Sequence, residues 1–374
     1  MSPWPCSTPP PSRSTDAPND VGAVGVVLAL RQGEVVAAGA TSGAEQELGV
    51  RINGQVRTAI ADVGQVGVSR AGDEVVVNVS ALDLGLGSGG FDIVCVNLTR
   101  GCDANPPTGA HVMKLNYTSL QHPVVPVEAE GLSLPVRRPV AVCALHGQLA
   151  PLAWAFARAT PGARLGYVHT VGGALPAGHS RTVRQLRQRG LLAGHVSAGA
   201  AHGAEEEAMS VAGALHHGLV EAGWQAAVCA PGPGMVGSAS ALGHGGMAAL
   251  DSAHGALALG CPTLLVARMS SADPRERHRG LSHHTQTVLD LLLAPVTVAL
   301  PTDVPGPTPV DAGPSEVRPH GHRTVWRQTA AELAAYEASG LPSVTMGRTL
   351  SEDPLFFSAA LAGGGALADM MVDR

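Results

Sequence analysis

The chain has 374 residues, enough for two domains or for one large domain with an appendage. Hydrophobic residues make up 45% of it and charged residues 14%, proportions that exclude an intrinsically disordered chain. The formal net charge of −6 argues against a surface that follows nucleic-acid phosphates. No apolar run of about 18 residues predicts a membrane-spanning helix, so neither nucleic acid nor membrane is an expected partner.

The cysteines indicate the cellular location of the protein, and the basic residues indicate its source. The six cysteines form no Cys-x-x-Cys pair, and three of them lie inside apolar strand-like runs. We therefore expect reduced cysteines and a cytoplasmic location. All but one of the 24 basic residues are arginine, a bias typical of a genome rich in G and C, which favours a bacterial source.

The first third of the chain predicts a tail followed by a β domain. Residues 1–20 are rich in proline, serine and aspartate, and too few of them are apolar to offset the entropy of ordering, so a disordered tail is expected. From 21 to 135, short apolar runs are separated by glycine and aspartate turns. About six strands of this kind predict a small antiparallel β barrel or sandwich.

After residue 139 the pattern changes. Longer apolar runs now alternate with helix-length segments. Strands without polar alternation are typical of a parallel sheet covered on both faces, so residues 139–300 predict a doubly wound α/β domain. Residues 301–374 predict a linker, rich in proline and glycine up to 325, followed by two helices. We expect these helices to pack on the α/β domain or on a partner subunit, because the protein can form a homo-oligomer.

Polar side chains follow five of the predicted strands in the α/β domain. They are His146; His169 and Thr170; Ser197 and His202; the start of the glycine-rich turn at Gly232; and Arg268 with Ser270, Ser271 and Asp273. The carboxyl ends of parallel strands meet at one edge of a sheet, where α/β proteins bind their ligands. A ligand site is therefore predicted at this edge.

The glycine-rich turn supplies one half of the predicted site. Gly232, Gly234 and Gly237 match Gly-x-Gly-x-x-Gly between a strand and an expected helix, so their backbone N–H groups and the hydroxyl of Ser238 are expected to bind an anion. A tight turn without a ligand is the alternative. A nicotinamide or flavin site is disfavoured, because the next strand ends at Arg268 and not at an acidic residue, so the cofactor stays unknown.

The segment 273–285, DPRERHRGLSHHT, supplies the other half. In one interpretation its arginines, together with Arg268, bind a phosphate or carboxylate, Ser282 caps the following helix and contacts the ligand, and catalytic groups transfer a proton. The arginines are Arg275, Arg277 and Arg279, and the catalytic candidates are His283, His284 and Asp273.

Two other interpretations of the same segment stay open. His278, His283 and Asp273 could bind a metal ion, with His284 as a substitute for His283, because adjacent histidines on a helix point about 100° apart and only one is well placed. Alternatively the segment is a solvated loop with internal salt bridges. His244 and His254, within the next expected helix, are interpreted as packing residues.

Three blocks of sequence resemble the bacterial family named domain of unknown function 3866. They are CAPGPGMVGSASALGHGG, ARMSSADPRERHRGLSHHTQTVL and, in the β domain, HVMKLNYTSLQ. The resemblance covers residues 21 to about 370 and implies an acidic residue after Thr170, where this chain has Val171. It brings no established activity, so it leaves open whether the protein is an enzyme.

These patterns lead to one functional expectation with two alternatives. We expect a small anionic, nucleotide-like ligand at the carboxyl edge of the parallel sheet, with hydrolase or transferase chemistry assisted by histidine. The alternatives are a metal-dependent enzyme that uses the block of His278, His283 and His284, and a non-enzymatic regulatory or scaffold protein.

Overall fold

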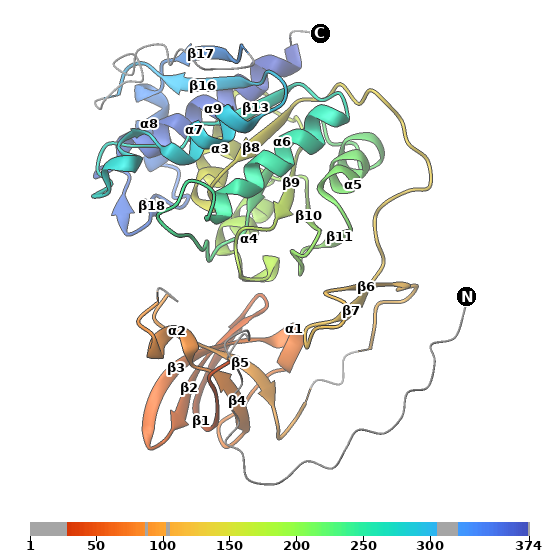
Figure 1. The fold of residues 1–374 in the computed structure, drawn as a ribbon, viewed down its shortest axis with the longest axis vertical. Helices are drawn as coiled ribbons and strands as arrows, with labels where there is room; N and C mark the ends of the chain where they lie inside the picture. The colour runs from red at the N-terminus through yellow and green to blue at the C-terminus, as the bar shows by residue number, and fades with distance from the viewer. Residues whose placement is uncertain (1–27, 87–88, 102–104, 305–320, 373–374) are drawn as a thin grey trace, which may run out of the picture.

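The computed structural model describes residues 28–86, 89–101, 105–304 and 321–372. The tail expected at residues 1–20, and most of the linker expected at 301–325, lie outside these residues. The described chain forms a small barrel and a larger domain built on a parallel sheet, and an arm of chain passes between them (Figure 1). The predicted combination of a β barrel with an α/β domain is confirmed.

The barrel is closed by five strands in the order β1-β2-β3-β5-β4. Their bounds are β1 Leu30–Ser42, β2 Glu45–Ile52, β3 Gln55–Asp62, β4 Glu74–Asn78 and β5 Asp92–Asn97. The core of the barrel is formed by every second residue of its strands. In β2, Leu48, Val50 and Ile52 point inward, while the residues between them are more exposed. The pairs are antiparallel except β3–β5, which is parallel and differs from the all-antiparallel expectation.

Shorter elements connect the barrel to the second domain. The helical turns α1 Val63–Val66 and α2 Ser80–Asp83 lie on the barrel, and the hairpin of β6 Val112–Lys114 and β7 His122–Val124 forms the arm. Polar contacts join the domains: His179 of the larger domain binds the carboxylate of Asp62 at 2.7 Å, and Arg181 binds Glu45 at 2.7 Å.

The larger domain contains an eight-stranded parallel sheet in the order β11-β10-β9-β12-β8-β13-β16-β17. The strands are β8 Val140–Cys143, β9 Leu165–Thr170, β10 Gly194–Ala198, β11 Glu206–Ala208, β12 Ala226–Pro231, β13 Thr263–Val266, β16 Thr297–Pro301 and β17 Arg323–Arg327. Every residue of β8, β9, β10, β12 and β13 is buried, as the continuous apolar runs predict. Residues 323–325, expected in the linker, instead begin the edge strand β17.

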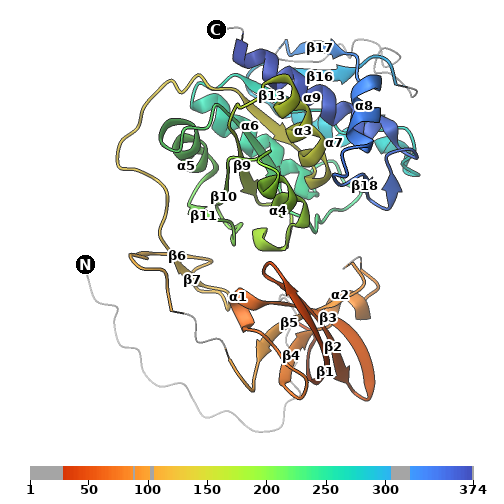
Figure 2. The ribbon, with the colours of Figure 1, turned by 180° about the vertical axis from the view of Figure 1, so that it is seen from behind.

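Helices cover both faces of this sheet, which makes it doubly wound. One face carries α3 Leu149–Ala159, α4 Arg181–Gln188, α8 Ala330–Glu337 and α9 Pro354–Val372, and the other carries α5 Val211–His216, α6 Ala248–Ala258 and α7 His283–Leu291 (Figure 2). The chain leaves β8 toward β9 on one side, and leaves the adjacent strand β13 toward β16 on the other. Ligands of doubly wound sheets bind at such a switch point.

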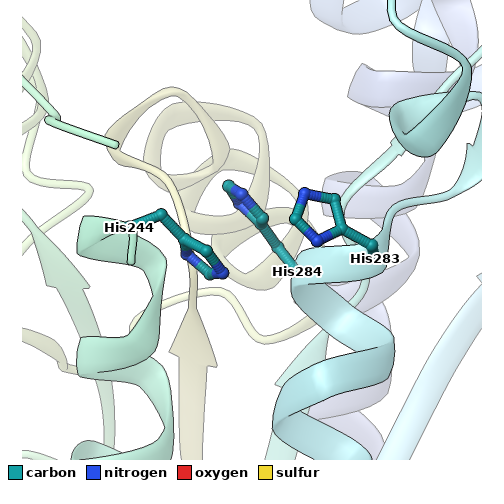
Figure 3. A group of neighbouring side chains, drawn as sticks. All are labelled: His244, His283 and His284. Atoms are coloured by element: carbon teal, nitrogen blue, oxygen red, sulfur yellow. The ribbon is translucent and has the colours of Figure 1, made fainter. Parts of the chain in front are cut away.

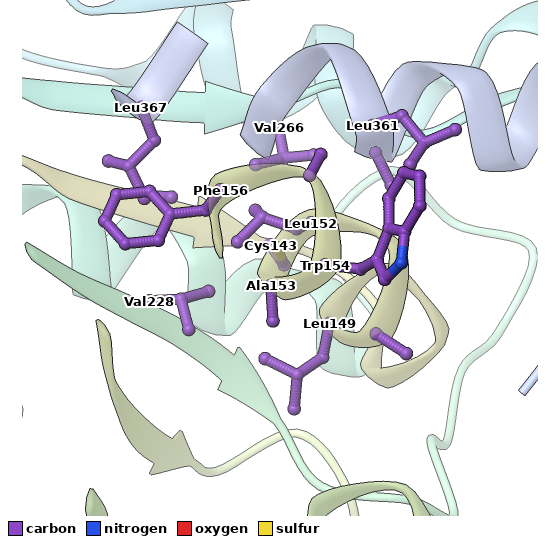
Figure 4. Close-up of a cluster of buried hydrophobic side chains, with 14 of the residues drawn as sticks. Cys143, Leu149, Leu152, Ala153, Trp154, Phe156, Val228, Val266, Leu361 and Leu367 are labelled. Carbon is purple, nitrogen blue, oxygen red and sulfur yellow. The ribbon is translucent and has the colours of Figure 1, made fainter. Parts of the chain in front are cut away.

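The last helix, α9, is the most deeply buried helix of the domain. It is long and apolar enough to cross a membrane, but 14 of its residues are buried against α3 and the sheet. Leu361 and Leu367 of α9 meet Phe156 and Leu152 of α3 in one apolar cluster (Figure 4). Its burial identifies α9 as a core helix of the α/β domain.

A glycine on β9 makes room for the largest side chain in the core. A Cβ atom added to Gly166 would lie 1.8 Å from the ring of Trp224, which is 1% exposed. We expect Gly166→Ala to lower the free energy of unfolding by about 3 kcal/mol, since overpacking a dense core forces the backbone to shift. Urea unfolding of Gly255→Ala is the matched control: its new methyl meets nothing closer than 3.8 Å, and a similar loss there would contradict the steric explanation.

Candidate functional site

The glycine-rich turn does not lead directly into a helix, which corrects the expectation for residues 232–238. Val236 and Gly237 instead pair with Gly245 and His244, and α6 begins only at Ala248. The N-terminus of α6 is therefore separated from Gly232, Gly234 and Gly237 by an exposed hairpin. Ser238 bonds within that hairpin, to Ser240 Oγ at 2.8 Å.

The glycines of this turn allow close packing of backbone. A Cβ atom on Gly232 would lie 2.1 Å from Nε2 of His169, and one on Gly173 would lie 2.2 Å from the carbonyl oxygen of Gly232. The same crowding occurs between Gly172 and Gly245. Contact with the loop after β9 explains these glycines without a ligand, so the structure favours the alternative of a tight turn.

Arg268 lies just beyond β13, at the switch point of the sheet. Its backbone N–H donates to Thr285 Oγ1 at 2.9 Å, and its guanidinium Nη1 donates to Nδ1 of His284 at 2.7 Å. The side chain is 3% exposed. Burial, followed by the charge of Arg275, lowers the pKa of Arg268 to about 10, so a buried positive charge is present at neutral pH.

Asp273 is the carboxylate around which the arginines near Arg268 gather. Its side chain is 0% exposed and accepts two hydrogen bonds from the Arg275 guanidinium, both at 2.9 Å. Arg348 approaches the same carboxylate at 3.2 Å and Arg268 at 3.7 Å. With both oxygens engaged by arginines, Asp273 organises the segment, and this geometry does not suit the catalytic or metal-binding role expected from the sequence.

The other arginines of the segment have different environments. Arg279 donates through Nε to the carbonyl oxygen of Asp273 at 3.0 Å. Arg277 is exposed and forms no ion pair with any residue that the structure describes. Among the arginines proposed to bind an anion, Arg275 is thus occupied by an internal salt bridge, and Arg277 is the most available.

Ser282 caps α7, as the sequence predicts. Its Oγ accepts the backbone N–H of His284 and lies 2.8 Å from Nδ1 of His278. These bonds place His283 and His284 in the first turn of α7. Ser282 is 0% exposed, so its hydroxyl positions the two histidines.

Three imidazoles gather at this edge: His244 from the hairpin before α6, with His283 and His284 from α7 (Figure 3). Arg268 contacts this group through His284. One ring nitrogen from each lies within 4.8 Å of the others. The rings of His244 and His284 are stacked, with centroids 3.5 Å apart and planes 11° apart. We call Arg268, His244, His283 and His284 the histidine–arginine cluster; His278 adjoins it, 4.8 Å from the ring of His283.

Two nitrogens of this cluster are buried and have no hydrogen-bond partner among the described residues: Nδ1 of His244 and Nε2 of His283. Burial lowers the pKa of His244, His283 and His284, and the charge of Arg268 lowers each further, to about 2 for His284. At neutral pH the cluster therefore combines neutral imidazoles with one buried cation.

Three residues at this site were not predicted from the sequence. His244 was interpreted as a packing residue, but it stacks on His284 and contributes an unpartnered nitrogen. Arg348 and Asp353 come from the segment before α9: Arg348 binds Asp273 and Asp353, and Asp353 accepts from Ser270 Oγ at 2.6 Å. The His-Gly pairs that begin at His244 and His254 were a signal for His244. Nothing in the local sequence indicated Arg348 or Asp353.

The remaining polar strand ends lie along the same edge of the sheet. His146 follows β8, and its Nε2 lies 2.9 Å from Ser180 Oγ. His169 is stacked with His195 of β10, at 5.9 Å between centroids. His202 faces a pocket between the two domains. The polar edge predicted from the sequence is therefore divided between the cluster and more distant groups.

A closed barrel linked to a doubly wound sheet, with a polar edge at its switch point, defines a two-domain α/β protein. Residues 59–364 match the family described as a protein of unknown function, DUF3866. This match covers most of the chain, which therefore belongs to that family. No curated protein and no solved structure matches the chain.

Proposed function

We propose that the histidine–arginine cluster binds a small anionic ligand that carries a phosphate or carboxylate group. The observation that supports this is the buried cation of Arg268 beside two unpartnered imidazole nitrogens, on His244 and His283. Residues 268–279 contain four arginines against Asp273 and Glu276, so the surroundings favour negative charge. An anion would offset the charge of Arg268 and accept hydrogen bonds from these imidazoles once they are protonated.

The arrangement also supports proton transfer. His244 donates through Nε2 to the carbonyl oxygen of Ala241 at 2.9 Å, which leaves Nδ1 as an acceptor in the neutral ring. A bound anion raises the pKa of a nearby imidazole, because opposite charge favours the protonated form. His244 or His283 can then exchange a proton with the ligand, as hydrolysis or group transfer requires.

A metal site is the second candidate, because three histidine nitrogens lie within 4.8 Å. Ligand lone pairs lie in the plane of an imidazole, and the stacked rings of His244 and His284 direct theirs along parallel planes, away from a shared ion. The lone pair of His284 Nδ1 already accepts from Arg268. The ring geometry and the neighbouring cation both favour an anion over a metal.

A regulatory or scaffold role without catalysis is the third candidate. The salt bridges around Asp273 support it, because they occupy Arg275 and Arg348. The C-terminal helices, expected to pack on the α/β domain or on a partner subunit, pack on their own domain, with α9 buried against α3. Ligand binding favours the first proposal over this role only if the binding depends on the residues of the histidine–arginine cluster.

The proposal predicts that inorganic phosphate binds, and that Arg277→Ala weakens its affinity about tenfold in calorimetry. The loss of one charge-assisted hydrogen bond, on the order of 1.5 kcal/mol, corresponds to this factor. Arg277 is exposed and outside the salt bridges, so the fold should be retained.

Arg31→Ala is the matched control, since Arg31 is exposed on the barrel and its guanidinium bonds, among the described residues, to the carbonyl oxygen of Leu30. Unchanged phosphate affinity in Arg277→Ala would remove Arg277 from the site. Stoichiometric zinc in protein purified without a histidine tag, lost in His283→Ala, would replace the anion proposal with the metal candidate.

A further inference from the structure

A pocket of about 640 Å³ lies between the two domains. Its walls come from α1 and β5 of the barrel, from the arm, and from the loops after β9 and β10. The carboxyl edge of a parallel sheet and the interface between domains are both settings in which proteins bind small molecules. The volume is in the range of a ligand of drug size. We call this the interdomain pocket.

The charged side chains on its walls are acidic. Among the described residues that line it, Asp62 and Glu207 carry carboxylates and none is lysine or arginine. Their partners lie behind them: His179 binds Asp62 and Lys114 binds Glu207, each at 2.7 Å, with side chains only 4% and 1% exposed. Backbone N–H groups also donate to these carboxylates, from Gly64 and Gln65 to Asp62 and from Gly203 to Glu207. An occupant of the pocket therefore shares carboxylates that already accept hydrogen bonds, while the basic groups are shielded from the pocket.

One imidazole on the walls, that of His122, adds a further acceptor. Nδ1 of His122 donates to the carbonyl oxygen of Leu120 at 2.9 Å, so Nε2 is an acceptor in the neutral ring. The side-chain amide of Gln65 lies 3.1 Å from Nε2 of His202 and fixes that ring across the domain interface. The carboxylates and Nε2 of His122 thus favour a ligand that brings N–H donors.

The rest of the wall combines the polar side chains of Asn105, Ser119 and Gln121 with an apolar part. The apolar part includes Ala44, Leu120 and four prolines, Pro106, Pro107, Pro123 and Pro176. Rigid apolar walls with a few placed polar groups favour a compact hydrocarbon body. An anion is disfavoured by Asp62 and Glu207, so the occupant differs in charge from the ligand proposed for the histidine–arginine cluster.

We propose that the interdomain pocket binds a small organic amine. Its ammonium donates to the carboxylates of Asp62 and Glu207 and to Nε2 of His122, and its hydrocarbon body packs on the proline walls. Because both domains contribute walls, the bound amine also stabilises their relative position. This proposal is independent of the anion site, since the two share no residue.

The test uses two probes with similar bodies and opposite charge, phenethylamine and phenylacetate, added to the full chain at millimolar concentration. We expect calorimetry to show binding of the amine at least tenfold tighter than binding of the carboxylate. Equal affinities, or binding of the carboxylate alone, would overturn the proposal, as would the absence of heat from the amine at concentrations that saturate a millimolar site.

Two tryptophan variants locate the binding. Leu120 lines the pocket and its side chain makes none of the polar contacts, so Leu120→Trp fills the space and should weaken amine binding at least tenfold. Leu242→Trp, on the exposed hairpin before α6, should leave it unchanged. Amine affinity that survives Leu120→Trp would place the binding elsewhere. Asp62→Asn, which retains the side-chain shape, should weaken binding of the amine without strengthening that of the carboxylate.

Discussion

Asp273→Asn should lower the free energy of unfolding by about 3 kcal/mol or more, because removing one partner of a buried ion pair leaves the other charge uncompensated. Arg268 is 3% exposed, and its nearest carboxylate is Asp273 at 3.7 Å. Arg275 and Arg348 lose the same partner. Burial alone would raise the pKa of Asp273, but hydrogen bonds from Arg275 and the charge of Arg348 hold it well below its usual range.

Urea unfolding at neutral pH measures this effect, and Glu276→Gln is the control, because Glu276 is exposed in the same segment. We expect the control to change stability by less than about 0.5 kcal/mol. The depressed pKa fixes the sign for pH: the contribution of Asp273 is complete above pH 4 or so and is lost only in stronger acid. A loss in Asp273→Asn no larger than that of the control would show that Arg268 is compensated by other groups.

Acid should unfold the protein well above the pH at which Asp273 titrates. Burial lowers the pKa of several histidines, among them four whose pKa falls to about 4 for His146, about 3 for His195 and His278, and about 2 for His284. In the unfolded chain they titrate near pH 6.5. Between these values the unfolded chain binds more protons, so stability is complete above about pH 7 and falls as the pH decreases.

The free energy of unfolding is expected to fall by about 1.4 kcal/mol per pH unit for each histidine. For these four histidines together the slope is about 5 kcal/mol per pH unit. Domains are stable by only about 5–15 kcal/mol, so unfolding near pH 5 is expected. Urea unfolding at pH 7.5, 6 and 5 measures the slope. His195→Phe, which retains a ring against Tyr167, should reduce the slope by the contribution of one proton. His111→Gln, at an exposed position, should leave the slope unchanged. An unchanged slope in His195→Phe would show that this ring is protonated when folded.

Periodicity predicted the layers of the molecule because it depends on burial. The continuous apolar strands β8, β9 and β12 and the alternating strand β2 follow directly from which faces meet water. It placed helix boundaries less well. The consecutive glutamates Glu205–Glu207 favour the N-terminus of a helix, but Glu206–Ala208 form β11 and Ser210 caps α5, because pairing with β10 outweighs local helix propensity.

The candidate site was predictable in part. Because polar residues directly follow an apolar strand, the sequence predicted Arg268 and His284 at the sheet edge. The cap at Ser282 was predicted because a serine hydroxyl before a helix accepts a free backbone N–H group. The role of Asp273 was not predictable, because Arg348 lies 75 residues away and arrives only through tertiary packing. The glycine-rich turn was expected to lead into a helix, and local sequence could not decide its role, because glycines that admit a neighbouring backbone have the same spacing as glycines that admit a phosphate.

The burial of α9 determines when the α/β domain can fold during synthesis. Strands β8 to β13 leave the ribosome first, yet the part of their sheet and of α3 that α9 covers stays exposed until residues 354–372 arrive. A nascent chain halted before that point exposes Phe156 and Leu152 to solvent, and exposed apolar surface of this kind attracts chaperones or aggregates. The barrel, complete by Asn97, has no such dependence and can form while the rest is being translated.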